Sequence, residues 1–190
     1  MENATGPAVR YVVDTKASQF SVQAFASGLI SAVAHSPRIA IREWSGEAEF
    51  VPGSLRDARL KVKVDPSSLE VLDELRDDDK REIHRVMNHE VLESTRYSEI
   101  RYQSTRVIAD RKNETLYRVK IEGTLDLHGV TKSLELNCQL AFGLDTLRVH
   151  GDFMILQPDY NIKVASIARG TLKLRDELKF TYYVVARKQN

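Results

Sequence analysis

The sequence predicts an all-β protein, an antiparallel barrel of about eight strands with one helix inserted near its mouth. Three observations lead to this prediction. Apolar and polar residues alternate with a period of two over most of the chain, which is typical of strands with one buried and one wet face. The alternating segments follow one another at short range, so consecutive strands are expected to pair. One segment, residues 77–93, has helical spacing instead.

The strands are expected in chain order, one for each alternating segment. The segments are residues 20–24, 46–50, 60–64, 100–102, 117–127, 134–142, 147–155 and 178–184. In the fifth, Tyr117, Val119 and Ile121 share one face, whereas Arg118 and Lys120 share the other. Parallel strands would be apolar on both faces, so this pattern indicates an antiparallel sheet. Closing a meander on itself removes its unpaired edges, which makes a closed barrel the economical topology.

The helix is expected within residues 77–93. Ile83, Met87 and Val91 recur at helical spacing, and the acidic residues 77–79 suit the positive end of a helix dipole. Because strands lie on both sides of this segment in the sequence, the helix should sit over one rim of the barrel. We therefore expect Ile83, Met87 and Val91 to form the helical part of a binding site at the mouth.

Composition bounds the domain organisation and the partners. The 190 residues contain no linker or internal repeat, so we expect one domain over residues 1–190 with an ordered core at 10–187. Hydrophobic residues make up 42% and charged residues 29% of the chain, which argues against disorder. The formal net charge is +1, so nucleic acid and acidic membrane surfaces are not expected as partners.

The predicted location is the cytoplasm. Residues 1–10 lack the charged start and apolar run of a secretory signal, and a periplasmic location would require that a signal had been removed. No stretch approaches the roughly 18–20 apolar residues of a membrane span, so integral membrane association is not expected. Cys138 is the single cysteine and cannot form an intramolecular disulfide.

The predicted inner face is uncharged and contains small residues. Ala24, Gly46, Ala48, Gly123 and Gly151 share the parity of the apolar positions. These small residues permit curvature, leave space inside the barrel, or do both. An empty void of about 300 Å³ would cost on the order of 7 kcal/mol at roughly 24 cal/mol per Å³, so such a space should be occupied. A ligand in it would have to be mostly hydrocarbon.

The parity of the strands defines the expected cavity wall. The residues expected to line a lipid-binding cavity are Phe20, Val22, Ala24, Leu60, Val62, Ile100, Tyr102, Leu125, Leu136, Cys138, Val149 and Phe153. Trp44 is interpreted either as part of this wall or as a plug at one end of the barrel, with the plug preferred.

Several motifs resemble those of the YceI-like family, the lipocalin-like polyisoprenoid-binding proteins. Residues 123–132 (GTLDLHGVTK) resemble its G-x-L-T-I-H-G-V-T-K motif, and residues 76–92 resemble its R-D-x-H-L helix. Residues 97–104 (YSEIRYQS) resemble its Y-P-x-I-x-F-x-S strand, with Ser98 in place of proline. Residues 157–161 (QPDYN) depart from its R-x-D-F-G element. The likeness runs from about Tyr11 to Val185.

The resemblance implies an eight-stranded lipocalin-like barrel that binds a long-chain amphiphile without catalysis. The ligands it implies are a polyisoprenoid, an isoprenoid quinone or a fatty-chain lipid, held for carriage, storage or sensing. It also suggests a homodimer. The polar end of such a ligand is expected to meet His35, Arg38 or Tyr160 at the mouth.

Two other classes of function stay open on the residues alone. A hydrolase acting on a bound amphiphile would need a nucleophile beside a base, but Cys138 lies on the apolar face and no G-x-S-x-G motif occurs. His84 and His89 are five residues apart and do not share a helix face, so neither a metal nor another cofactor is expected. An interaction module acting through the outer face of the barrel is the second alternative. A lipid recovered by organic extraction would favour the carrier over this module.

Overall fold

The structure is a computed structural model that describes residues 6–27, 36–163, 166–167 and 172–189. The strands are β1 (Val9–Val13), β2 (Gln19–Ser27), β3 (Arg38–Ile41), β4 (Trp44–Val51), β5 (Ser54–Val64), β6 (Leu69–Val71), β7 (Ile100–Arg111), β8 (Leu116–Leu127), β9 (Val130–Phe142), β10 (Thr146–Leu156), β11 (Ser166–Ile167) and β12 (Leu172–Lys188). His35 and most of the segment between β2 and β3, which the sequence suggested as a loop or short helix, lie outside the described residues.

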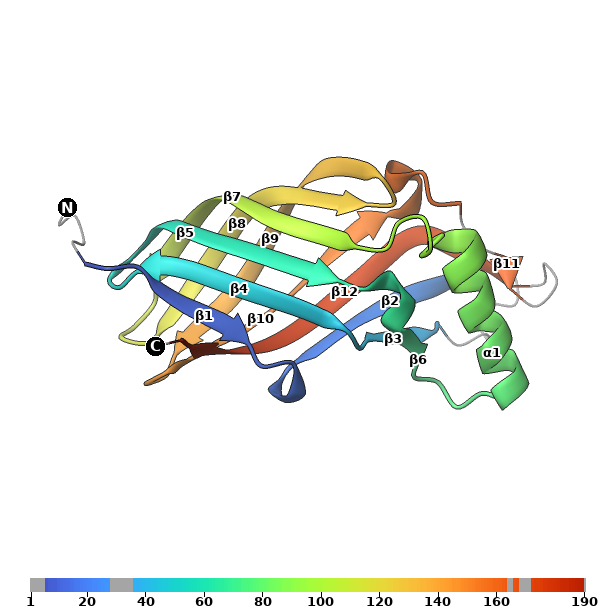
Figure 1. Cartoon of the computed structure of the whole chain (residues 1–190), viewed down its shortest axis with the longest axis horizontal. Coiled ribbons are helices and arrows are strands. Elements are labelled where there is room, and N and C mark those ends of the chain that lie inside the picture. The colour runs from blue at the N-terminus through green and yellow to red at the C-terminus, as the bar shows by residue number, and fades with distance from the viewer. Residues whose placement is uncertain (1–5, 28–35, 164–165, 168–171, 190) are drawn as a thin grey trace.

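The strands close into an antiparallel barrel, as predicted. The hydrogen-bonded order is β1-β4-β5-β7-β8-β9-β10-β12, and β12 pairs back onto β1, which gives a ring of eight strands. Figure 1 shows this barrel from the side, with both termini near one end. Because every strand in the ring has two partners, the ring leaves no exposed edge.

At three of the eight positions in the ring, two consecutive strands take the place of one long strand. β1 and β2 lie one after the other on β12, since Val13 pairs with Ala186 and Gln19 with Tyr183. A 3₁₀ turn at Thr15–Ala17 separates them, and the Asp14 side chain accepts a hydrogen bond from the Ala17 amide at its start. β3 and β4 share a second such position, and β5 and β6 share a third. The sequence did not predict β1, β3, β6 or β11 as separate strands, because these short segments carry too few alternating residues.

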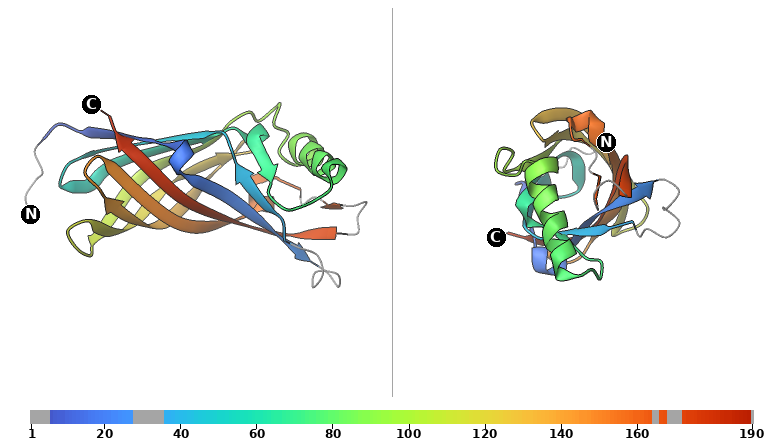
Figure 2. Two further views of the ribbon diagram at one scale, coloured as in Figure 1. Left: turned by 90° about the horizontal axis from the view of Figure 1, so that it is seen from below. Right: turned by 90° about the vertical axis from the view of Figure 1, so that its right-hand side faces the viewer.

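The inserted helix lies where the spacing of apolar residues predicted it. α1 (Asp77–Val86) continues into a π-helical turn, Met87–Val91. Asp77, Asp78 and Asp79 occupy its first turn. The end-on view in Figure 2 shows α1 lying across the mouth of the barrel, at the end opposite the termini.

An aromatic cluster fills the end of the barrel near the termini. Tyr11 stacks on Phe50 with ring centroids 5.5 Å apart, and Phe142 meets Phe50 edge-on at 5.8 Å. Tyr117 packs edge-on against Phe142 at 5.5 Å. Leu147 and Ala186 are buried in the same region. The barrel is therefore plugged at one end and covered by a helix at the other.

Candidate ligand cavity

A cavity of about 300 Å³ runs through the barrel. Its lining extends from Phe50 and Leu147 at the plugged end to Ile83 and Met87 under the helix. Among the described residues of the lining, Glu47 alone has a charged side chain, and that carboxylate pairs with Arg10 and Lys61. Water-filled or charged contents are thus a poor match for the surface of this cavity, whereas hydrocarbon is a good one.

Every residue that the sequence placed on the cavity wall lines this cavity in the structure. These residues are Phe20, Val22, Ala24, Leu60, Val62, Ile100, Tyr102, Leu125, Leu136, Cys138, Val149 and Phe153. The helical residues Ile83, Met87 and Val91 line it too. Period-two alternation brings them together because the side chains of one parity all point to the inside of a closed sheet. Their contact with a ligand stays a prediction.

The wall near the helix is aromatic. Phe153 stacks on Phe180 with ring centroids 4.7 Å apart and planes 3° from parallel. Phe20 packs against Phe180 at 6.2 Å and meets Trp44 edge-on at 5.4 Å. Trp44 also packs with the buried cluster around Met87. The structure therefore places Trp44 in the cavity wall near the helix, while other aromatic side chains plug the opposite end.

Two of the small inward residues make room for tyrosines. A Cβ atom built on Gly123 would lie 2.5 Å from the Tyr102 hydroxyl oxygen, and one built on Gly151 would lie 2.6 Å from that of Tyr182. The same Cβ atoms would approach backbone carbonyl oxygens at 2.5 and 2.7 Å. The interpretation that these two glycines leave space for a ligand is therefore wrong, because tyrosine rings already cover them.

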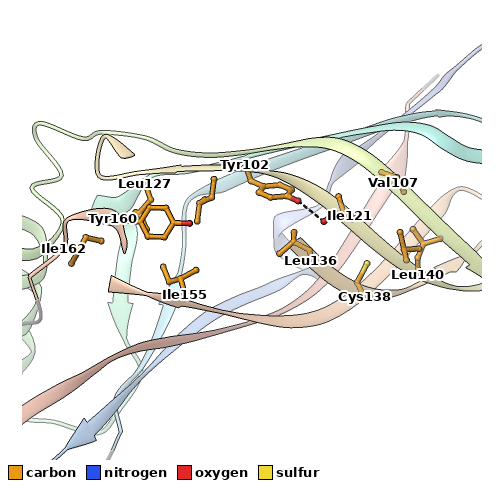
Figure 3. Packing of buried hydrophobic residues seen from close by; sticks show 12 residues of the cluster. Tyr102, Val107, Ile121, Leu127, Leu136, Cys138, Leu140, Ile155, Tyr160 and Ile162 are labelled. Carbon is orange, nitrogen blue, oxygen red and sulfur yellow. Dashed lines mark hydrogen bonds between the residues drawn. The ribbon is translucent and has the colours of Figure 1, made fainter. Parts of the chain in front are cut away.

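The phenol and thiol groups of the cavity wall are neutral. The Tyr102 hydroxyl donates to the carbonyl oxygens of Ile121 and Leu134, at 3.3 and 3.2 Å. Figure 3 shows the first of these bonds, with Cys138 further along the barrel between Leu136 and Leu140. Burial raises the pKa of the Cys138 thiol to about 11, and burial also raises the pKa of Tyr102 and of Tyr182. All three therefore stay protonated at neutral pH.

A polar junction near the mouth joins three connecting segments. His128, in the turn between β8 and β9, donates from Nδ1 to the carbonyl oxygen of Tyr160 at 3.2 Å. Its ring packs on Tyr97 with centroids 4.3 Å apart, and its Nε2 lies 3.5 Å from a carboxylate oxygen of Glu93. Glu93, His128 and Asn161 all have positive φ angles. The sequence showed His128 only as a turn residue, because its partners are distant in the chain.

Of the three residues expected to meet a ligand's polar end at the mouth, the structure describes Tyr160 and Arg38, which differ in burial. Tyr160 is only 3% exposed and belongs to the buried core cluster beside Leu127 and Ile155, as Figure 3 shows. Arg38 is exposed at the start of β3. His35 lies outside the described residues. The described part of the chain contains no group of three or more His, Cys, Asp or Glu side chains that could hold a metal ion.

Comparison with known proteins gives one family and several similar folds. A family model described as a YceI-like domain matches residues 11–186. BcnA of Burkholderia cenocepacia is 16% identical with a TM-score of 0.70, covering 91% of this chain and 98% of its own. A polyisoprenoid binding domain from Saccharophagus degradans, implicated in plant cell wall breakdown, is 13% identical with a TM-score of 0.65, over 94% and 98% of the two chains.

The YceI protein of Campylobacter jejuni is a third similar structure. It is 16% identical with a TM-score of 0.61, over 83% of this chain and 88% of its own. At these identities the likeness shows the fold alone. No curated protein matches the sequence. Among the described residues, none of the helices has both the length and the apolar character needed to cross a membrane.

Proposed function

We propose that this chain, which belongs to the YceI-like family, binds the hydrocarbon part of a long-chain amphiphile inside its barrel and carries out no catalysis. A polyisoprenoid or an isoprenoid quinone is the leading candidate, held for carriage, storage or sensing. The observation that supports this proposal most strongly is the cavity itself. Its volume of about 300 Å³ lies within the range of ligand sites, roughly 300–1,000 Å³, and its lining is almost entirely apolar.

The length of the cavity favours a chain-like ligand. Its lining spans the barrel from Leu147 beside the plug to Met87 under the helix, so a chain would lie along the barrel axis. We expect entry at the helix end, because Phe50 and Phe142 pack tightly at the other. None of the residues of α1 is fully buried, so few tightly packed side chains hold this helix over the mouth.

Ligand identification tests the proposal directly. Purified protein is extracted with organic solvent and the extract is analysed by mass spectrometry, with an equal mass of an unrelated purified protein as the control. A long-chain lipid recovered in a fixed molar ratio supports the proposal. An extract without lipid, together with a protein that takes up no isoprenoid or fatty chain added in detergent, contradicts it.

A matched pair of variants tests whether the lipid lies in the cavity. Ala48 lines the cavity and retains exposed surface there, so Ala48→Phe should fill space that a ligand would use. Ala141, on β9, points outward, and Ala141→Phe adds the same bulk outside the barrel. We expect Ala48→Phe to lose most of the bound lipid and Ala141→Phe to keep it. Equal retention by both folded variants would place the lipid elsewhere.

The outer face of the barrel supports a second candidate, an assembly function. Met154 and Leu156 on β10 are 52% and 45% exposed, and Tyr183 on β12 is 42% exposed. Apolar surface of this kind favours contact with another chain, and a homodimer is the simplest assembly. Sedimentation at micromolar concentration tests it, since a monomer there would contradict the dimer.

A further inference from the structure

Two tyrosines of the cavity wall, the buried Tyr102 and the half-buried Tyr182, extend toward β9 from its two sides. Tyr102 on β7 reaches across β8, where its hydroxyl lies over Gly123. Tyr182 on β12 reaches across β10, where its hydroxyl lies over Gly151. β9 runs between β8 and β10, and its Cys138 pairs with Gly151 on one side and with Val119 on the other. The Tyr182 hydroxyl therefore lies beside Cys138, whereas the Tyr102 hydroxyl lies further along β9, at Leu134.

The two hydroxyls differ in how well they are paired. Tyr102 donates to two backbone carbonyl oxygens and is held against the wall. The Tyr182 hydroxyl lies over Gly151 in the cavity wall, and a polar side chain that neighbours it within the described residues is the Cys138 thiol. Sulfur is a weak hydrogen-bond acceptor, so the Tyr182 hydroxyl can donate its proton to a stronger acceptor. A plain hydrocarbon beside it would leave that donor poorly satisfied.

The charge of the side chains that line the cavity indicates which kind of ligand group could accept a hydrogen bond from Tyr182. The described cavity lining contains no lysine, arginine or histidine, so a buried phosphate or carboxylate would have no counter-charge. A neutral phenol beside a neutral thiol suits a neutral oxygen. We propose that the Tyr182 hydroxyl hydrogen-bonds to an uncharged oxygen of the bound ligand, such as the carbonyl of a quinone, ester, amide or ketone. This inference rests on the proposed lipid-binding function and adds that an oxygen-bearing part of the ligand lies deep in the barrel.

A pair of probes that differ in one oxygen tests this inference. A long-chain methyl ketone and the n-alkane of equal carbon number compete with a polarity-sensitive fluorophore for delipidated protein. We expect the wild type to bind the ketone about tenfold more tightly than the alkane, which corresponds to about 1.4 kcal/mol. Tyr182→Phe should remove this preference without weakening alkane binding. Tyr183→Phe, at the exposed neighbouring residue, is the control and should keep it.

The outcomes separate this inference from the proposed function. If both probes bind the wild type with equal affinity, or if Tyr182→Phe keeps the preference, the inference is wrong while lipid binding stands. If neither probe binds, both fail. Infrared spectroscopy gives a second readout that needs no variant. The stretch of an isotope-labelled ketone carbonyl should shift to lower frequency in the wild-type complex than in alkane solvent, and an unshifted band would overturn the inference.

Discussion

The hydroxyl of Tyr102 occupies the place that a side chain at residue 123 would need. A Cβ atom on Gly123 would lie 2.5 Å from the Tyr102 oxygen and 2.5 Å from the carbonyl oxygen of Gln103. Glycine at this position lets the phenol lie against β8 and reach the carbonyl oxygens of Ile121 and Leu134. The same relationship recurs between Tyr182 and Gly151.

Gly123→Ala should destabilise the barrel. The added methyl group would collide with backbone as well as with the phenol, so neither neighbour can simply rotate away. Overpacking of this kind costs about 1–3 kcal/mol, which corresponds to a melting temperature lowered by several degrees. Thermal denaturation followed by circular dichroism measures it. Gly6→Ala is the control, because nothing lies within 4 Å of its Cβ position. Equal melting temperatures for the two variants would contradict the prediction.

Cys138 should react slowly with thiol reagents in the folded protein. Its side chain is buried and its pKa is raised to about 11, so the reactive thiolate is scarce at pH 8 and inaccessible. We expect modification by a bulky maleimide to be at least about a hundredfold slower than in denaturant. Mass spectrometry of the intact protein gives the rate. Rapid modification of folded protein, unaffected by added lipid, would show that the thiol does not face the interior.

His128→Ala should loosen the junction at the mouth. It removes the hydrogen bond to the Tyr160 carbonyl and the contact with the Tyr97 ring, and it places alanine at a φ of 53°. Together these changes should cost about 2 kcal/mol of unfolding free energy. His128→Asn should cost less, because asparagine tolerates positive φ. Urea denaturation measures the stability of both variants. An alanine variant as stable as the wild type would show that the contacts of His128 do not stabilise the fold.

The contribution of Asp14 to stability should depend on pH. The hydrogen bond from Arg187 is the main cause that lowers the pKa of this carboxyl below its ordinary value of 3.8. A carboxyl with a lowered pKa in the folded state stabilises the protein above its unfolded pKa, and that stabilisation is lost as the pH falls through the folded value. Asp14→Asn should thus be less stable than wild type at about pH 6 and approach it at about pH 3. Urea denaturation at the two pH values measures this. A stability difference between variant and wild type that is the same at both pH values would contradict a stabilising role for the ionised Asp14 carboxylate.

The sequence assigned residues to the inner face of the barrel more completely than it assigned the short strands. Residues such as Leu136 and Val149 could be assigned to the cavity because parity within a strand fixes which side a residue faces. Short strands such as Arg38–Ile41 and Leu69–Val71 were missed, since their extended form depends on pairing with each other. The role of His128 was missed for a similar reason, because its contacts with Glu93 and Tyr160 join separate connections.

The sequence by itself determined the antiparallel sheet, the place of the helix and the apolar inner face. These properties follow from the spacing of apolar residues, which is local and needs no knowledge of neighbouring strands. Only the tertiary structure decided that β12 closes on β1, that Phe50 and Phe142 plug one end, and that the phenols of Tyr102 and Tyr182 lie over glycines of neighbouring strands. These relationships depend on the register between strands far apart in the chain, and a shift of register would move each of these side chains past its partner.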